Sequence, residues 1–246
     1  MKRLSLLLIF VFLISLIILN FFTISFIPTK TETITITPAE KNLSSKNVIK
    51  LKVPAIDENG NGVLTILIVE AVPGKGRVLT DIDHLIFFID TQNSIQIAKA
   101  VAQNITGIDT SKVDLIYQIE TNASAIGGPS AGAALTIATI AALENKTLNE
   151  KVGITGTINL DGSIGPVGGI EEKAKASKEA GIEIFLVPKG QGTGITYIPK
   201  RECRKIGPIL FCTTEYSIKK VDVSESVGIK VKEVSNIQEA LKYFLE

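Results

Sequence analysis

The chain has 246 residues, with 26 lysines and arginines against 25 aspartates and glutamates, and its formal net charge is +1. This length has room for one sizeable globular domain and an accessory segment. Because the net charge is near zero and the basic residues form no stripe, the composition argues against a nucleic acid as partner.

The first predicted element is a membrane anchor at residues 1–27. Residues 4–27 carry no charged side chain and are mostly apolar, and a helix of this length crosses a hydrocarbon layer of about 30 Å. A cleaved signal peptide is the alternative. Such a peptide has a shorter apolar stretch and a small-residue cleavage site, whereas this stretch ends in Ser25, Phe26 and Ile27. We therefore predict a retained, single-pass anchor.

Basic residues flank this anchor on both sides, so their number does not decide its orientation in the membrane. Lys2 and Arg3 precede the apolar stretch and favour a cytoplasmic N-terminus, but lysines also follow it. The very short N-terminal tail is shaped like a signal sequence, and we expect the main domain to lie outside the cytoplasm. Residues 28–47, rich in Thr, Ser, Lys and Asn, predict an extended linker that holds the domain off the bilayer.

Residues 48–246 predict one globular domain. Strand-like runs at residues 48–56 and 63–72 are separated by the sequence ENGNG, a strong hairpin signal. A helical pattern follows at residues 94–105, and a further strand ends at Glu120.

The second half of the domain alternates helices with strands. An alanine-rich segment that starts at Ser130 is apolar on all sides and predicts a buried helix. The remaining predicted elements are a turn at Asp161 and Gly162, a helix from about 169 to 180 that stops at Gly181, a strand at 183–188 and a closing amphipathic helix at 236–246. This alternation predicts an α/β or α+β domain with a mixed sheet.

Residues 190–220 are interpreted as an insertion in this domain. They contain both cysteines, Cys203 and Cys212, on either side of a short turn at Gly207 and Pro208. A hairpin closed at this turn brings the two cysteines within disulfide reach, which suits an oxidising compartment. Two buried thiols are the alternative.

The sequence lacks the residue patterns of a metal site and of a phosphate-binding loop, and it offers only one histidine for a catalytic triad. The only histidine, His84, would have to serve any Ser-His-Asp triad, and we interpret it as an ordinary packed or surface side chain. No group of His, Cys and carboxylates has metal-ligand spacing, and the segment PGKGR at residues 73–77 lacks the phosphate-loop pattern. We therefore expect no metal, ATP or other cofactor, and a nucleophile here needs a base other than histidine.

The segment GGPSAG at residues 127–132 is the first positive signal. Glycines and a proline lead directly into the buried helix at Ser130. Glycines allow a substrate to approach the backbone, and the free N–H groups at a helix start stabilise an oxyanion. We therefore predict backbone of an oxyanion site at Gly128, Pro129 and Ala131. The alternative is that Ser130 only caps the helix.

Lys173 is the second signal. On a helical wheel, Lys173 falls in the middle of the face that carries Ala174, Ala176 and Ser177, and its charged neighbours, Glu172 included, fall on the other face. An ammonium buried without a partner tends to lose its proton, and a neutral amine can take the proton of a serine hydroxyl. The alternative is a structural lysine whose amine reaches back to the solvent.

Taken together, these residues resemble the proteolytic domain of the Lon family of Ser/Lys proteases. The resemblance covers most of the chain from Val48 onward and is densest from Gly127 to Lys189. It rests on GGPSAGAAL around the serine, on ITGTINLDGSIGPVGGIEEKAKA, and on AGIEIFLVPKG. A chance serine motif rarely has a matching lysine helix behind it, so the combination is specific.

The resemblance implies a Lon-type proteolytic domain with a mixed sheet, a serine endopeptidase without a cofactor. Ser130 would be the nucleophile and Lys173 the general base, while the hydroxyl of Thr155 would hold the lysine amine. Polypeptides are the implied substrates. Lon-like domains commonly form rings, so a homo-oligomer is expected as well.

Two features depart from the family pattern. Many Lon proteases carry Asp three residues before the nucleophile, where this chain has Gly127. We expect this difference to change the fine geometry of the site and to leave the class of reaction unchanged. No ATPase module precedes the domain in this sequence, so we expect ATP-independent cleavage of unfolded or exposed segments.

Two alternative functions remain at this stage. The first is a catalytically silent, membrane-tethered binding or assembly module on the same fold, because a fold does not guarantee activity. The presence of Ser130, Thr155 and Lys173 together argues against it. The second is a hydrolase of non-peptide amides or esters, which a comparison of peptide and ester substrates would distinguish.

Overall fold

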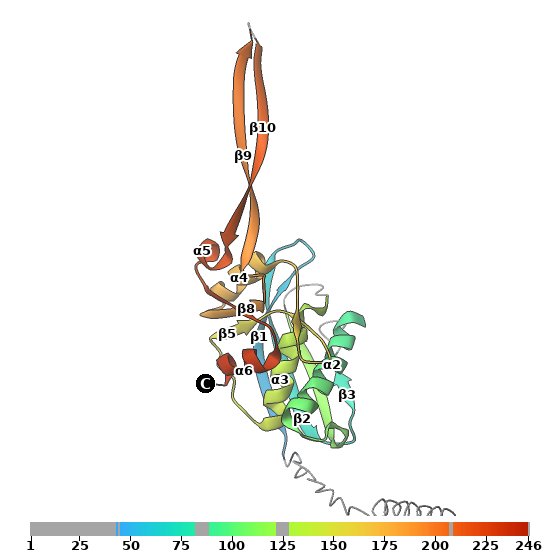
Figure 1. The fold of residues 1–246 in the computed structure, drawn as a ribbon. Helices are drawn as coiled ribbons and strands as arrows, with labels where there is room; N and C mark the ends of the chain where they lie inside the picture. Colours follow the sequence, from blue (N-terminus) through green and yellow to red (C-terminus); the bar gives the residue numbers. More distant parts are fainter. Residues whose placement is uncertain (1–42, 44, 82–88, 122–127, 207–208, 246) are drawn as a thin grey trace, which may run out of the picture. The chain divides into compact units, whose positions relative to one another are not determined.

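The computed structural model describes residues 43, 45–81, 89–121, 128–206 and 209–245, which all belong to one folded unit (Figure 1). The predicted anchor and most of the linker lie outside the described residues, as do His84 and Gly127. Among the helices that are described, none is both long enough and apolar enough to cross a membrane.

The first sheet has four strands in the order β1-β2-β4-β3. Strands β1 (Asn47–Ile56) and β2 (Gly62–Pro73) form the predicted antiparallel hairpin, and β2 also pairs antiparallel with β4 (Val113–Glu120). The short strand β3 (Val78–Thr80) pairs parallel with β4 and makes the sheet mixed, as predicted. In the hairpin turn, Asp57 accepts hydrogen bonds from the backbone N–H groups of two asparagines.

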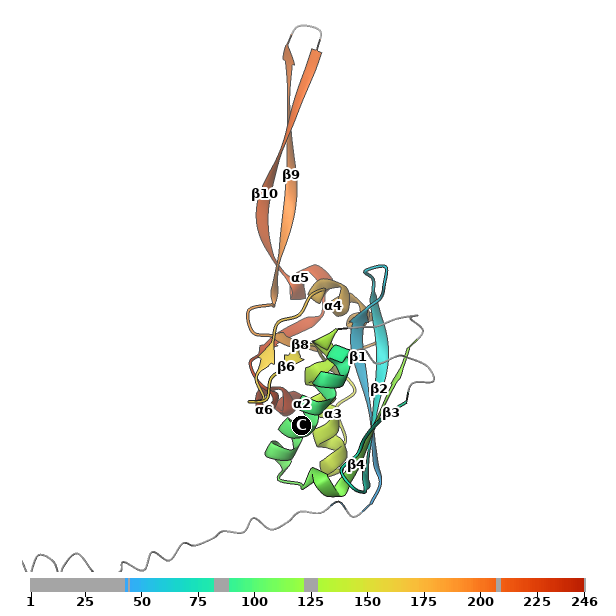
Figure 2. The same ribbon diagram turned by 90° about the vertical axis from the view of Figure 1, so that its right-hand side faces the viewer.

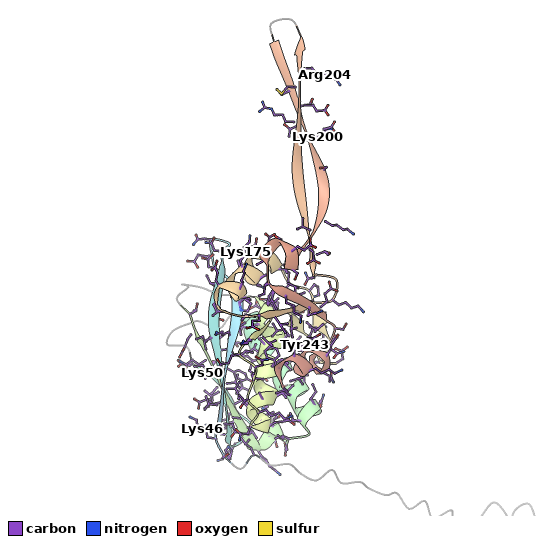
Figure 3. The ribbon with its side chains drawn as sticks, turned by 90° about the vertical axis from the view of Figure 1, so that its left-hand side faces the viewer. Lys46, Lys50, Lys175, Lys200, Arg204 and Tyr243 are labelled. Carbon is purple, nitrogen blue, oxygen red and sulfur yellow. A yellow bond between two sulfur atoms is a disulfide. The ribbon has the colours of Figure 1, made fainter. Side chains whose placement is uncertain are left out.

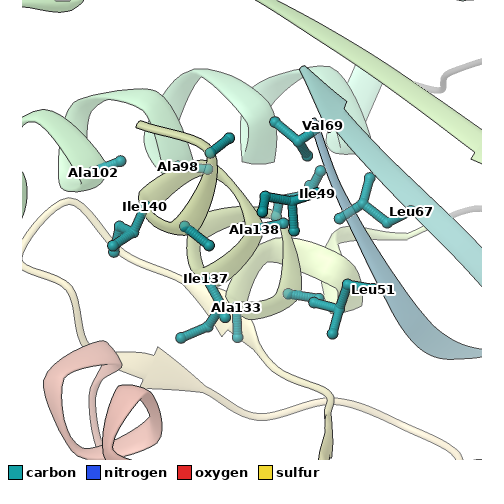
Figure 4. Close-up of a cluster of buried hydrophobic side chains, with 14 of the residues drawn as sticks. Ile49, Leu51, Leu67, Val69, Ala98, Ala102, Ala133, Ile137, Ala138 and Ile140 are labelled. Carbon is teal, nitrogen blue, oxygen red and sulfur yellow. The ribbon is translucent and has the colours of Figure 1, made fainter. Parts of the chain in front are cut away.

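Helices α2 (Ile89–Thr106) and α3 (Gly132–Glu144) pack together on one face of this sheet (Figure 2). Every residue of α3 from its start to Leu143 is buried, which confirms the prediction from its all-round apolar sequence. Alanines let α3 approach its neighbours closely. Figure 4 shows this contact, with labelled residues from α2 and α3 and from strands β1 and β2: Ala98, Ala102, Ala133, Ile137, Ala138, Ile140, Ile49, Leu51, Leu67 and Val69.

A second sheet of three parallel strands has the order β11-β8-β5. Its strands are β5 (Val152–Ile154), β8 (Ile184–Pro188) and β11 (Lys230–Val234). Parallel neighbours need a crossover, and α4 (Ile170–Glu179) supplies the one between β5 and β8. This sheet was not predicted, although the strand at β8 and the helix at α4 were.

The remaining short elements lie outside these two sheets. Strands β6 (Thr157–Ile158) and β7 (Ile164–Gly165) form a small antiparallel pair around the predicted turn. Helix α5 (Val223–Val227) contributes to a second apolar cluster with α4 and β8, and α6 (Ile237–Phe244) is the predicted closing helix.

The stretch interpreted as an insertion is a long antiparallel hairpin. Its strands, β9 (Thr193–Ile206) and β10 (Ile209–Asp222), extend away from the two sheets in both views (Figures 1 and 2). Cys203 and Cys212 occupy directly opposite positions, 4.0 Å apart at Cα, and are joined by a disulfide. Lys200 and Arg204 lie exposed on this hairpin (Figure 3).

Replacing both cysteines by serine is expected to loosen the far end of the hairpin and leave the rest of the domain intact. A two-stranded ribbon is only marginally stable alone, and a disulfide that closes a loop of about ten residues stabilises it by about 2–3 kcal/mol. Hydrogen exchange of residues 200–215 should therefore accelerate in the double variant, while exchange of α3 stays unchanged. Equal protection of the hairpin in both proteins would contradict this.

Candidate active site

A pocket of about 520 Å³ lies where the start of α3, the β6–β7 region and α4 meet. It brings together Ser130 and Lys173, which the sequence analysis selected from separate segments. The other residues of its lining are Ile56, Gly60, Gly128, Pro129, Thr157, Pro166, Val167, Gly168, Gly169 and Glu172.

Ser130 lies in a 3-10 turn, η2 (Pro129–Ala131), directly before α3. The prediction that the regular helix starts at Ser130 is therefore wrong by two residues. Gly128 enters the turn at φ +99°, a conformation that side-chain-bearing residues rarely adopt. The carbonyl of Ser130 accepts a hydrogen bond from the Gly156 N–H at 2.9 Å, which fixes the turn against the chain that follows β5.

The turn also limits which backbone groups can stabilise an oxyanion. Pro129 has no N–H and cannot donate, so its part is to fix the geometry of the turn. The first N–H groups of a helical turn have no partner inside it, which leaves the N–H of Ser130 as the natural donor, next to Gly128 and Ala131.

Thr155 is completely buried behind the serine. Its hydroxyl donates to the Ser130 carbonyl at 3.3 Å, and its backbone N–H donates to the Leu186 carbonyl at 3.0 Å. Thr155 therefore ties the turn that carries Ser130 to the parallel sheet. A hydroxyl that donates one hydrogen bond can still accept another, so the contact with the Lys173 amine stays a prediction.

Lys173 is 3% exposed, on the buried face of α4 that the helical wheel predicted. Burial lowers the pKa of the Lys173 amine from its ordinary value of 10.5 to about 8. Within the described ranges, no carboxylate forms an ion pair with this amine. The amine is still mostly protonated at pH 7, but its neutral form becomes the major one above about pH 8.

The position of Glu172 differs from the prediction of the helical wheel, which placed this side chain on the outer face of α4. The side chain is half-buried and lines the pocket. It lies in the first turn of α4, where no preceding turn covers a side chain, so a helical wheel separates inside from outside poorly. By contrast, Lys175 is exposed on the outer surface, as expected (Figure 3).

Gln191 supports the pocket wall and was missed by the sequence analysis. Its side-chain oxygen accepts from the Val167 N–H at 2.9 Å, and its side-chain amide donates to the Val167 carbonyl at 2.7 Å. One glutamine thus satisfies both backbone groups of a wall residue. Because Gln191 lies two residues before the start of β9, it links the root of the hairpin to the pocket wall. No local sequence signal marks such a contact.

The part of the chain that the structure describes holds no cluster of three or more His, Cys, Asp or Glu side chains able to bind a metal. The pocket therefore presents a serine, a buried lysine and a carboxylate from the described residues. Such a set can carry out nucleophilic attack with proton transfer.

The fold and the pocket define a mixed α/β domain with a serine at a helix start and a buried lysine in the same cavity. The family model of the Lon protease (S16) C-terminal proteolytic domain matches residues 55–221. The chain therefore belongs to the Lon protease family, through its proteolytic domain.

Individual relatives agree with this assignment. The chain is 34% identical over 149 residues to a Lon protease of Vibrio parahaemolyticus, covering 58% of the chain and 18% of that protein. It is 30% identical over 181 residues to a Lon protease of Azospirillum brasilense, covering 72% and 22%. An archaeal Lon protease of Thermococcus kodakarensis is 32% identical over 122 residues, covering 46% and 19%. The chain thus spans about a fifth of the length of these relatives.

Replacing Lys173 by methionine is expected to stabilise the fold at neutral pH. Methionine keeps an unbranched apolar stem and removes the buried amine. A pKa lowered from 10.5 to about 8 corresponds to a cost of about 3 kcal/mol for burying the protonated amine. Urea denaturation at pH 7 should show a free energy of unfolding higher by as much as this amount in Lys173→Met.

The pH dependence provides the control. Between about pH 8 and 10.5 the unfolded chain binds more protons at this group than the folded chain, so the wild-type stability rises with pH across this window. Below the window the full cost is present, and above it the cost is gone. Lys173→Met should lack this rise. A variant that is less stable than the wild type at pH 7 would show that the amine has a structural partner.

Proposed function

We propose that this chain is a serine endopeptidase in which Ser130 is the nucleophile and Lys173 is its general base. The observation that carries the proposal is a single cavity lined by both residues, with the lysine amine desolvated and its pKa lowered to about 8. Membership of the Lon protease family supports the same chemistry.

The reaction follows from the placement of these groups. The neutral amine of Lys173 takes the hydroxyl proton of Ser130 as the oxygen attacks the peptide carbonyl. The Ser130 N–H and the backbone at Gly128 and Ala131 stabilise the negative oxygen of the tetrahedral intermediate. The protonated lysine then gives its proton to the nitrogen of the scissile bond. The C–N bond breaks, the amine leaves, and the acyl group remains on the Ser130 oxygen as an acyl-enzyme. Water, deprotonated by the same lysine, releases the acyl group and restores the serine.

The proposed substrates are unfolded polypeptides or exposed segments, cleaved without ATP. The 246-residue sequence contains no phosphate-binding loop of the G-x-x-x-x-G-K-[ST] type. We also propose a homo-oligomeric assembly, by analogy with the family.

The proposed location is the membrane, with the peptidase domain on the outer side. The apolar, uncharged residues 4–27 support a tether, and the Cys203–Cys212 disulfide supports an oxidising compartment. Asn42 begins the sequence Asn-Leu-Ser, an acceptor pattern for N-glycosylation. Protease protection of sealed membranes, or detection of a glycan at Asn42, tests which side of the membrane the domain occupies. Exposure of the domain to the cytoplasm would refute the topology without affecting the chemistry.

The direct test uses the full chain in detergent and an unfolded protein substrate without ATP. Ser130→Ala and Lys173→Ala should each lose at least about 10³-fold in kcat/KM, because nucleophile and base act as one unit. Lys175→Ala is the matched control, since Lys175 is exposed on the same helix, and it should keep wild-type activity. Undiminished cleavage by Ser130→Ala or Lys173→Ala would refute the assignment of nucleophile and base. A wild type that does not cleave would favour a catalytically silent module.

The pH profile tests the role of the lysine. Only the neutral amine is a base, and with a pKa of about 8 its neutral fraction rises about tenfold per pH unit below pH 8. We expect kcat/KM to rise through pH 6–8 and to level off above about pH 8. Steady-state kinetics on one uncharged peptide measures this. A flat profile between pH 6 and 9 would exclude an amine of this pKa as the base.

A further inference from the structure

Glu172 is the second charged group of the pocket and has no part in the proposed proton transfer. Its carboxylate oxygen Oε2 lies 3.7 Å from the position that a Cβ would occupy on Gly169. The carboxylate therefore borders the pocket wall next to the start of α4, while the side chain as a whole is half-buried.

This carboxylate has no hydrogen-bond or ion-pair partner among the described residues. Its neighbour Glu171 differs sharply, because it pairs with Lys175 at 3.0 Å and accepts from the Ser226 hydroxyl at 3.2 Å. The electrostatic attraction between Glu172 and Lys175 is weaker than the attraction between Glu171 and Lys175. A half-buried carboxylate without a partner gains from a cation that enters the pocket.

Glu172 and Lys173 line the same pocket without forming an ion pair with each other. Burial is the cause that lowers the pKa of the Lys173 amine, whereas a carboxylate paired with the amine would raise it. Lys173 has its role in the proposed proton transfer at Ser130, and the Glu172 carboxylate is available to a polypeptide segment bound in the pocket.

The space around Glu172 suits a long side chain. A Cβ added to Gly60, Gly128 or Gly168 would meet no atom within 4 Å, so the backbone there borders open space. Ile56 and Val167 add apolar walls. An unbranched stem ending in a cation matches a cavity with apolar walls, open backbone and one unpaired carboxylate.

We propose that Glu172 is a specificity-determining residue that selects polypeptide segments with a lysine or arginine beside the scissile bond and disfavours aspartate or glutamate there. This inference rests on the proposed peptidase function. A simpler role for Glu172 is to stabilise the start of α4 through its charge, a role that Glu171 in the same helical turn shares equally.

The test is a set of fluorogenic peptides that differ at one position next to the scissile bond, with arginine, glutamine or glutamate there. Full-length wild type, Glu172→Gln and Glu171→Gln are compared in detergent. We expect the wild type to prefer arginine over glutamate by about tenfold or more in kcat/KM, the size of one charge contact. Glu172→Gln should lose most of this ratio, and Glu171→Gln should keep it. Added salt should reduce the ratio in the wild type.

The outcomes separate this inference from the proposed function. Cleavage that depends on Ser130, with an equal arginine-to-glutamate ratio in the wild type and Glu172→Gln, would overturn the inference alone. So would a shifted pH midpoint in Glu172→Gln with an unchanged ratio, because Glu172 would then act on the lysine.

Binding of the same peptides to Ser130→Ala, measured by calorimetry, reads out the preference without turnover. If the wild type cleaves nothing, the proposed function fails, and this binding experiment still decides the charge preference. Equal affinity of Ser130→Ala and the double variant Ser130→Ala/Glu172→Gln for the arginine peptide would overturn the inference.

Discussion

The buried amine of Lys173 is the constraint on which the site depends. Desolvation lowers its pKa, so the contacts that keep water from the amine help to set its protonation state. Helix α4 is held tightly against the first sheet to do this: a Cβ on Gly62 of β2 would collide with the carbonyl of Glu172. On its other side, α4 packs into an apolar cluster that includes Phe185 and Val227. The favourable packing of this short helix between two sheets thus offsets the free-energy cost of burying the amine.

The serine is positioned mainly through its backbone. Its 3-10 turn is entered by a glycine at positive φ and is anchored through the Ser130 carbonyl to Gly156 and Thr155. Ser130 itself lines the pocket. The opposite wall is fixed by Gln191, whose side chain replaces a strand partner for Val167. Rigid backbone around a serine is what preorganised stabilisation of an oxyanion requires.

The β9–β10 hairpin extends away from the two sheets, and the residues at its root contact the pocket wall (Figures 1 and 2). Gln191 and Gly192 lie at its start, and the Gly192 N–H donates to Glu233 of the second sheet at 2.8 Å. The root of the hairpin is therefore joined both to the wall residue Val167 and to the second sheet. The family model extends to residue 221, so the matched region runs through most of this hairpin.

Local patterns in the sequence determined the elements and their buried sides. The ENGNG turn gave the β1–β2 hairpin, the all-apolar segment gave buried α3, and the helical wheel placed Lys173 inside, because hydrophobic periodicity records which side of an element avoids water. Only the tertiary structure decided that Ser130 and Lys173 share a cavity, that Glu172 turns into it, and that Gln191 clamps Val167. These contacts join segments far apart in the chain, and they depend on which element covers which face, which no local pattern encodes.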